Sequence, residues 1–382
     1  GFVVIVLTKS GNFGQNRREN MPAEGKREED MPDSGHKKDK AAVRKRLLEG
    51  AFFLVVMALS FYTVFRGQDM EKVRRALQNL SPLALGAALF TAVFFVSAEG
   101  IMIWYLLRSM NGKSGLFKCI SYSFIGFFYS GITPSATGGQ PMQLYYMCKD
   151  GNRLSESSVV LMTVALIYKF VLVVIGVVMI LFWHGPLKKY LRGYFPLYLL
   201  GLALNLLLVV ILLAVMLAPA GMRGMISRVE KLLVKCRIFK PSEGRMEKID
   251  QFVDGYRGAV QFLLTNKGKV FHVCLLTLMQ RCSVFVLTWI IYCGFSLKGS
   301  DMMTVMFLQA SVYIAVDMLP VPGAQGITEL MYRSIFAGIF TGATLMPSLY
   351  VTRGISFYFL LVAGVAVIAG NHFYRRREAG AV

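Results

Sequence analysis

The stretch Thr133-Pro134-Ser135-Ala136-Thr137-Gly138-Gly139-Gln140-Pro141 interrupts an apolar run that extends from Phe117 to Cys148. Two prolines, two glycines and three hydroxyl side chains prevent a continuous helix through this point. The charged pair Lys149 and Asp150 follows too soon for a second full membrane span, which takes roughly 20 residues. The stretch therefore predicts a re-entrant hairpin instead of a simple transmembrane helix.

A second interruption of similar composition is Pro320-Val321-Pro322-Gly323-Ala324-Gln325-Gly326-Ile327-Thr328-Glu329. It follows the apolar run 303–319 and precedes a short apolar helix that we expect to end near residue 340. We expect the first broken region to open toward the cytoplasm and the second toward the outside. Such a pair, one in each half of the chain and opposite in orientation, is typical of an inverted repeat.

Six apolar blocks are long enough to cross about 30 Å of hydrocarbon. They lie at 47–65, 81–107, 157–183, 194–217, 269–295 and 345–369. Hydrophobic residues make up 55% of the chain, which is more than soluble domains carry. The predicted fold class is an all-α membrane protein with about six full transmembrane helices and two broken or re-entrant helical regions.

The charge pattern predicts the domain organisation. The net charge of +20 comes from 42 basic and 22 acidic residues, and the basic residues cluster between apolar blocks. This is the positive-inside pattern, so we expect both termini in the cytoplasm and no nucleic-acid binding. We predict a disordered basic tail over 1–46, a polytopic transmembrane domain over 47–375 and a cytoplasmic tail over 376–382. The basic, amphipathic cytoplasmic loop 218–268 is expected on the anionic inner leaflet.

Lipid headgroups are the ligands that we expect at the two breaks. A broken helix leaves backbone N–H groups that attract anions, hydroxyl side chains can cap it, and glycines let a ligand approach the backbone. The candidate binding residues are Pro134, Ser135, Thr137, Gly138, Gly139, Gln140, Pro322, Gly323, Gly326, Thr328 and Glu329. The alternative is a pair of proline-kinked helices packed against their neighbours.

Several charged side chains are predicted at membrane depth, where each costs at least about 2.5–3.5 kcal/mol. They are Glu99, Lys169, Arg281, Asp317, Glu329, Arg333 and Arg353. We expect them to face an interior cavity and to pair, with Glu329–Arg353 and Lys169–Asp317 as candidate pairs. The alternative is a set of structural ion pairs that hold the helix bundle together.

Sequence motifs for catalysis are absent. The chain has no P-loop, H-E-x-x-H or G-x-S-x-G motif, and its six cysteines form no C-x-x-C pair. We therefore predict no catalytic residue, no metal site and no cofactor.

The two interruptions, 133–141 and 319–329, resemble the two signature segments of the lysylphosphatidylglycerol synthase transmembrane (flippase-like) family, the membrane half of the multiple peptide resistance factor. The resemblance covers roughly residues 47–375. It implies a bacterial plasma-membrane protein that moves lysylphosphatidylglycerol to the outer leaflet, which gives resistance to cationic antimicrobial peptides. Full-length members also carry a cytosolic domain that transfers lysine from lysyl-tRNA to phosphatidylglycerol. The chain ends a few residues after its last predicted span, so we expect the translocating half alone.

Three functions remain open at this point. The first is a lipid translocase for a phospholipid such as lysylphosphatidylglycerol or for another lipid phosphate. The second is a component of phosphatidylglycerol lysyltransferase that works with a separate aminoacyltransferase. The third is a non-transporting membrane scaffold that docks another membrane partner on the loop 218–268.

Overall fold

The computed structural model describes residues 80–133, 136–217, 245–319 and 326–380, with single positions at 71, 74, 75, 78 and 224. Backbone alone is described for 245–249 and 373–380. The predicted tail 1–46, the first predicted span 47–65 and most of 218–244 lie outside the described residues. Within the described ranges all regular secondary structure is helical, which confirms the predicted all-α class.

Five helical segments of the described chain are long and apolar enough to cross a membrane. They are α4 (Pro82–Ser109), α7 (Leu154–Phe182), the pair α8 (His184–Leu191) and α9 (Phe195–Leu217), α12 (Lys267–Gly294), and a final segment over Gly342–His372. Each coincides with a predicted span. The short helix α8 was not predicted; it extends the third of these segments toward its N-terminus.

Helices α4 and α12 form an antiparallel pair. The backbone N–H of Ser81 donates to Gly294 O at 3.4 Å, and Gln280 Nε2 donates to Phe95 O at 2.7 Å. The start of α4 therefore meets the end of α12, and the pairing continues toward their other ends. The Gln280 bond satisfies a buried amide, because that side chain is only 2% exposed.

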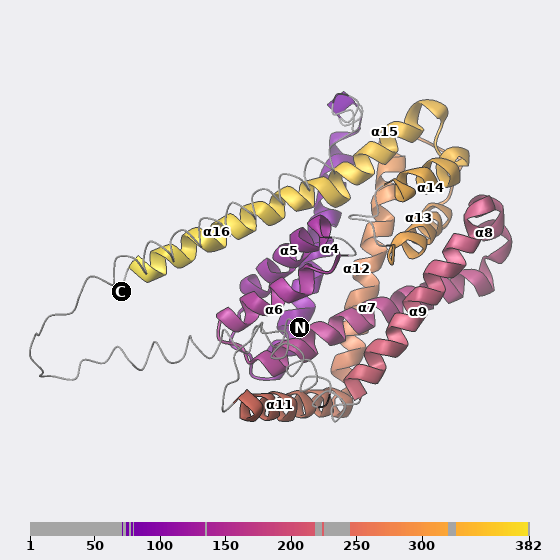
Figure 1. Cartoon of the computed structure of the whole chain (residues 1–382). Helices are drawn as coiled ribbons and strands as arrows, with labels where there is room; N and C mark the ends of the chain where they lie inside the picture. The colour runs from indigo at the N-terminus through magenta and orange to yellow at the C-terminus, as the bar shows by residue number, and fades with distance from the viewer. Residues whose placement is uncertain are drawn as a thin grey trace, which may run out of the picture. The chain divides into compact units, whose positions relative to one another are not determined.

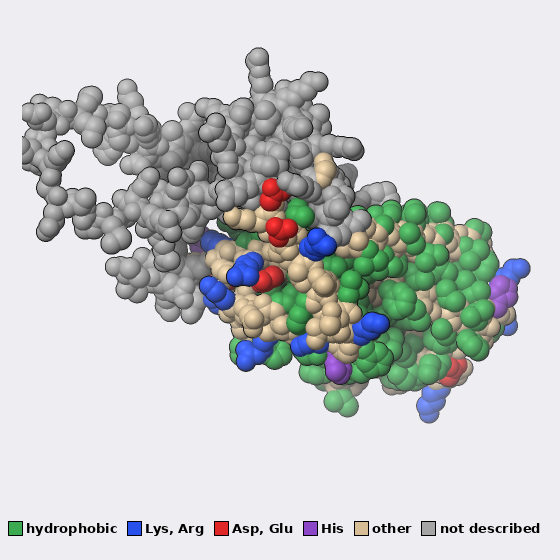
Figure 2. Space-filling model, turned by 90° about the horizontal axis from the view of Figure 1, so that it is seen from below, with side chains coloured by type: hydrophobic (Ala, Val, Ile, Leu, Met, Phe, Trp, Pro, Cys, Tyr) green, Lys and Arg blue, Asp and Glu red, His purple; other side chains and the backbone are tan. Residues whose placement is uncertain are grey.

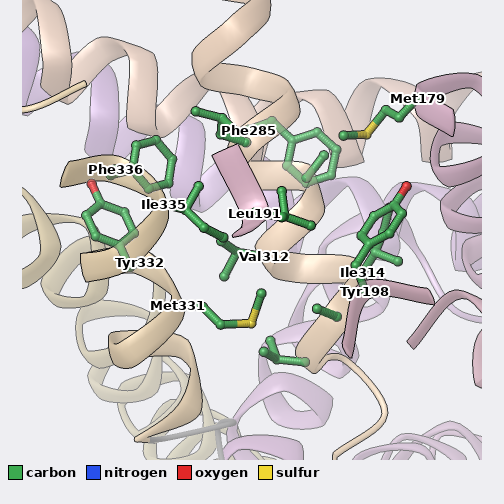
Figure 3. Packing of buried hydrophobic residues seen from close by; sticks show 14 of the residues in the cluster. Met179, Leu191, Tyr198, Phe285, Val312, Ile314, Met331, Tyr332, Ile335 and Phe336 are labelled. Atoms are coloured by element: carbon green, nitrogen blue, oxygen red, sulfur yellow. The ribbon is translucent and has the colours of Figure 1, made fainter. Parts of the chain in front are cut away.

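An apolar core joins α7, α9 and α12 to α13 (Met302–Val316) and α14 (Ile327–Ile335). Figure 3 shows side chains of this core, among them Phe285, Val312 and Ile335, gathered between their helices. The rings of Tyr332 and Phe336 stack with centroids 4.3 Å apart. Burying an apolar side chain of this size stabilises the fold by about 1.5–3 kcal/mol. The core therefore anchors the second broken region firmly in the bundle.

The first broken region is a helical hairpin of α5 (Leu116–Ile132) and α6 (Gly139–Lys149), which lie side by side (Figure 1). A Cβ at Gly139 would lie 2.0 Å from Ser130 Oγ, and a Cβ at Gly126 would lie 2.3 Å from Gln143 Nε2. Position 126 meets 143 while position 130 meets 139, an order that only antiparallel helices produce. Helix α6 therefore returns along α5, which excludes a kinked continuous span here.

The side chain of Thr133 closes the tip of this hairpin. Its Oγ1 donates to Tyr129 O at 2.6 Å and accepts a hydrogen bond from the Gly138 N–H at 2.9 Å. Pro134 and Ser135 lie outside the described residues. The hydroxyl thus serves both the last turn of α5 and the first N–H of the returning chain.

The second broken region consists of α13 and α14, which pack against each other (Figure 1). Residues 320–325 between them lie outside the described residues. Gly326 has a φ of +80°, a conformation that suits glycine. The Glu329 carboxylate accepts a hydrogen bond from the Gly326 N–H at 2.5 Å. This is the glutamate half of a capping box, and it fixes where α14 begins.

The last segment contacts both broken regions. It consists of α15 (Gly342–Arg353), a π-helical turn (Gly354–Phe359) and α16 (Leu360–Gly380). Arg353 pairs with Glu329 of α14, while Leu361 lies so close to Gly131 of α5 that a Cβ there would be 2.7 Å from its Cδ2. Helix α16 continues to Gly380, past the predicted end of the span at 369 and into the predicted tail 376–382.

Exposed basic side chains gather at one end of the helices. Figure 2 shows Lys and Arg around a polar surface there, with hydrophobic surface extending away from it. Three connections lie at this end: α4 to α5, α6 to α7, and α11 (Arg245–Thr265) to α12. The exposed basic residues near them are Arg108, Lys113, Lys118, Lys149, Arg153 and Lys267. The predicted topology, which the structure does not test, would place this end in the cytoplasm.

The described part of the loop 218–268 contains α11, whose buried side, with Phe252, Tyr256 and Val260, packs on α7. The predicted contact of this loop with the inner leaflet stays a prediction. The Tyr256 hydroxyl donates to Met162 Sδ at 3.2 Å, and a Cβ at Gly255 would lie 2.6 Å from Ser155 Oγ. An amphipathic pattern predicts that one face is buried, but it does not say whether lipid or protein covers that face.

Candidate functional site

A cavity of about 220 Å³ lies where the two broken regions meet. The first region contributes Ser130, Gly131 and Ala136 to its wall, and the second contributes Leu319 and Thr328. The second region also contributes side chains of α13 and α14, and parts of α4, α12 and the last segment complete the wall. A ligand in this cavity would therefore contact both halves of the chain at once.

The cavity wall is largely apolar but carries a few polar side chains. Gln309 lines it and is only 7% exposed, and its Oε1 has no hydrogen-bond partner among the described residues. Leaving a buried acceptor without a partner costs about 1–3 kcal/mol. An amide oxygen in this position is suited to accept a hydrogen bond from a bound molecule.

One ion pair in the wall joins α15 to α14. The Nε and Nη2 atoms of Arg353 each lie 2.9 Å from Glu329 Oε1. The side chains are 15% and 19% exposed, so the pair is shielded from most solvent. The predicted pair Glu329–Arg353 is therefore present, and its arginine faces the cavity.

A second ion pair joins α7 to the end of α13. The Lys169 ammonium contacts Asp317 Oδ2, and the Tyr168 hydroxyl donates to Asp317 Oδ1 at 2.6 Å. The lysine and aspartate side chains are 13% and 11% exposed. The predicted pair Lys169–Asp317 is also present, and its acidic member lines the cavity.

The two ion pairs present opposite charges to the same volume. Arg353 offers a planar cation that suits phosphate, and Asp317 offers a carboxylate that suits an amine. Each charge already has a partner, which limits the cost of burying it in the cavity wall. A molecule that carries both charges could add a contact to each pair, with its phosphate at Arg353 and its amine at Asp317.

Two further predicted charges lie close behind the cavity. Glu99 of α4 accepts a hydrogen bond from Gln143 Nε2 of α6 at 2.6 Å, so it ties the first hairpin to the central pair of helices. Arg281 of α12 is 4% exposed and lies against Phe95 and Tyr313, which both line the cavity. Neither charge is in the wall itself.

Arg333 differs from the expectation that the charges face inward. Its side chain is exposed, and no carboxylate among the described residues lies within 4.0 Å. It lies one turn after Glu329 on a short helix whose other face, with Met331, Tyr332 and Ile335, is buried. The cost of burying a charge predicts that a buried arginine is paired, but it does not predict on which face of α14 Arg333 lies.

Of the predicted headgroup residues, Gly138 and Gly326 donate their N–H groups to Thr133 and Glu329, and the others fall into three groups. Thr328 lines the cavity, and Glu329 holds the arginine that does so. Thr137 and Gln140 are exposed at the hairpin tip, and Gly139 is buried against α5 instead of facing a ligand. The predicted residues outside the described part of the chain are Pro134, Ser135, Pro322 and Gly323.

Several wall residues were not predicted, among them Gln309, Tyr313 and Thr352. A signal existed for Gln309, because an amide in the middle of an apolar helix needs a reason. Tyr313 and Thr352 give no such signal in sequence, since both residue types are common in buried helices.

Comparison with protein families gave one match. The family model described as Lysylphosphatidylglycerol synthase TM region matches residues 47–364. The match covers most of the chain, including both broken regions, and confirms the resemblance that the two interruptions indicated. No curated protein matched the chain. Together with the five long apolar segments, the family identifies a multi-pass membrane protein.

Proposed function

Since this chain belongs to the lysylphosphatidylglycerol synthase TM region family, we propose that it translocates a phospholipid such as lysylphosphatidylglycerol, or another lipid phosphate, across the membrane. The observation that carries this proposal is the cavity shared by both broken regions, with Arg353 and Asp317 in its wall. Transporters built from paired broken helices bind their substrates at such a junction.

The size of the cavity supports a headgroup as the ligand. Sites for whole drug-sized molecules occupy about 300–1,000 Å³, and this cavity of about 220 Å³ is smaller. It accommodates a phosphate and a short polar group, while acyl chains stay in the lipid. In this proposal the protein lies in a bacterial plasma membrane, and the basic end of its helices faces the cytoplasm.

The proposal is tested with purified protein in liposomes that contain acyl-labelled phosphatidylglycerol or lysylphosphatidylglycerol. Reduction of the label by external dithionite reports the lipid that reaches the outer leaflet. We expect transfer with the wild-type chain and a large loss in Glu329→Gln and Arg353→Ala. The exposed Arg333→Gln is the matched control and should retain transfer.

The enzymatic alternative is tested in the same preparation by adding lysyl-tRNA. Synthesis of lysyl-lipid by this chain alone would favour the lysyltransferase reading. Wild-type protein that neither moves nor binds lipid would refute the translocase and favour the scaffold reading.

A further inference from the structure

The buried cation Arg281 lacks the partner that the other buried cations have. Lys169 and Arg353 each contact a carboxylate, whereas no described carboxylate lies within 4.0 Å of Arg281. Its Nη2 donates to Gln280 Oε1 at 3.1 Å, but its Nε has no hydrogen-bond partner among the described residues. The residue is only 4% exposed, so water cannot compensate fully.

Aromatic rings surround this guanidinium. Its Cζ lies 3.9 Å from the ring centroid of Tyr168, 4.7 Å from that of Phe95 and 6.0 Å from that of Tyr313. A desolvated cation–π contact contributes about 2 kcal/mol. Removing an ion from water costs several kcal/mol, so the rings offset only part of the cost.

The nearby carboxylates are already engaged. Glu99 attracts Arg281 from a distance but accepts its hydrogen bond from Gln143. Both oxygens of Asp317 are taken, one by Tyr168 and one by Lys169. The cluster therefore holds a buried cation with no carboxylate in contact among the described residues; its hydrogen-bond partners are the Gln280 amide and the Tyr313 side chain.

The cavity lies one ring away from this cation. Phe95 and Tyr313 each contact Arg281 and also line the cavity. A ligand that passes from the cavity to the guanidinium would have to displace these two side chains.

We propose that Arg281 is an inner anion site, separated from the cavity by Phe95 and Tyr313, that binds the phosphate of the headgroup during its transfer. The proposal rests on the proposed function and goes beyond it, because it separates the binding site at Arg353 from a transit site. A guanidinium can hold two phosphate oxygens at once, which suits this role. The Arg281 Nε, which has no hydrogen-bond partner among the described residues, becomes one of the donors.

The test compares two readouts in the same variants. Equilibrium binding of dihexanoyl phosphatidylglycerol to the solubilised protein is measured by calorimetry, and transfer of acyl-labelled phosphatidylglycerol is measured in liposomes. Arg281→Met replaces the cation by an apolar side chain of similar length, a change that a buried site often tolerates. Arg281→Lys keeps the charge, and Arg333→Gln is the exposed control.

We expect Arg281→Met to slow transfer at least tenfold while binding changes less than about threefold. Arg281→Lys should retain more transfer than Arg281→Met, and Arg333→Gln should match the wild type. Transfer by Arg281→Met within twofold of the wild type, with the wild type active, overturns the inner site and leaves the proposed function intact.

A third arm separates a lipid headgroup from free phosphate. Uptake of labelled inorganic phosphate into the same liposomes is measured for the wild type and for Arg281→Met. Uptake that depends on Arg281, in protein that moves no lipid, supports the anion site but refutes lipid transfer. A wild-type protein that moves neither lipid nor phosphate refutes both the proposed function and the inner site.

Discussion

Substituting Gly139 by alanine should separate the two helices of the first hairpin. The added methyl group would lie 2.0 Å from Ser130 Oγ and 2.6 Å from the Gly126 carbonyl oxygen. The serine hydroxyl can rotate away, but the carbonyl belongs to the backbone of α5. Since ordinary contact begins near 3.4 Å, α6 must move away from α5 by about 0.8 Å.

The expected cost follows from this forced displacement. Overpacking of a closely packed interface costs about 1–3 kcal/mol. The matched control is Gly258→Ala in α11, where a Cβ would meet nothing within 4 Å. Alanine in an open helix interior stabilises by about 0.5–1 kcal/mol relative to glycine. The two variants should therefore differ by about 1.5–4 kcal/mol although the chemical change is identical.

The assay is thermal unfolding of the purified protein in detergent, followed by tryptophan fluorescence. With an unfolding entropy of about 2.1 cal/mol/K per residue, a chain of 382 residues shifts by roughly 1.2 °C per kcal/mol, so Gly139→Ala should unfold at least about 2 °C below Gly258→Ala. It should also lose lipid transfer, because Ser130 and Ala136 of the same hairpin line the cavity. If Gly139→Ala unfolds at or above the temperature of Gly258→Ala, the antiparallel contact between α5 and α6 is wrong.

Three further predictions concern single charged groups. Removing either member of the Glu329–Arg353 pair should lower the free energy of unfolding by about 3 kcal/mol. This is the low end for buried pairs, because the two side chains are still 15% and 19% exposed. A double-mutant cycle in thermal unfolding should show coupling, and additive effects would contradict the pair. Lys169→Met should destabilise more than the double variant Lys169→Met/Asp317→Asn, because the single change leaves a buried carboxylate without its cation; equal melting temperatures would argue against this pair. Asp301 caps α13, and hydrogen bonds from the hydroxyl and backbone N–H of the third helical residue lower the pKa of its carboxyl below the ordinary value of 3.8. The charge of Asp301 therefore stabilises the fold above pH 3.8, and this contribution is lost as the pH falls through the lower folded-state pKa. Asp301→Asn should melt below the wild type at neutral pH and approach it in acid. A difference in melting temperature that grows in acid would contradict this.

The long helices could be predicted because length and apolarity alone decide them. Every described span coincides with a predicted block, and both broken regions follow from clusters of prolines and glycines, which interrupt a long helix. The two ion pairs were also predictable, since buried charges need partners and few candidates exist at membrane depth. In these cases a single large free-energy cost, of breaking a helix or of burying an unpaired charge, leaves few possible structures.

Features that depend on which helix packs on which could not be predicted. The proximity of Gly126 to Gln143 requires the antiparallel register of the hairpin, and the docking of α11 on α7 requires a partner that the pattern does not identify. Arg333 occupies the exposed face of α14 because the other face packs into the core. Arg281 carried a sequence signal as a buried charge, but its aromatic surroundings come from three different helices.

The last helical segment, Gly342–Gly380, is attached to both broken regions, at one point each. Arg353 attaches it to the second broken region, and Leu361 presses against Gly131 of the first. Only about two turns of helix separate these points, so a displacement of one region would be transmitted through the segment to the other. The π turn over Gly354–Phe359 lies between the two points, where a helix bends or shifts register most easily. Stiffening that turn would make the two halves of the chain move together, and loosening it would let each move alone.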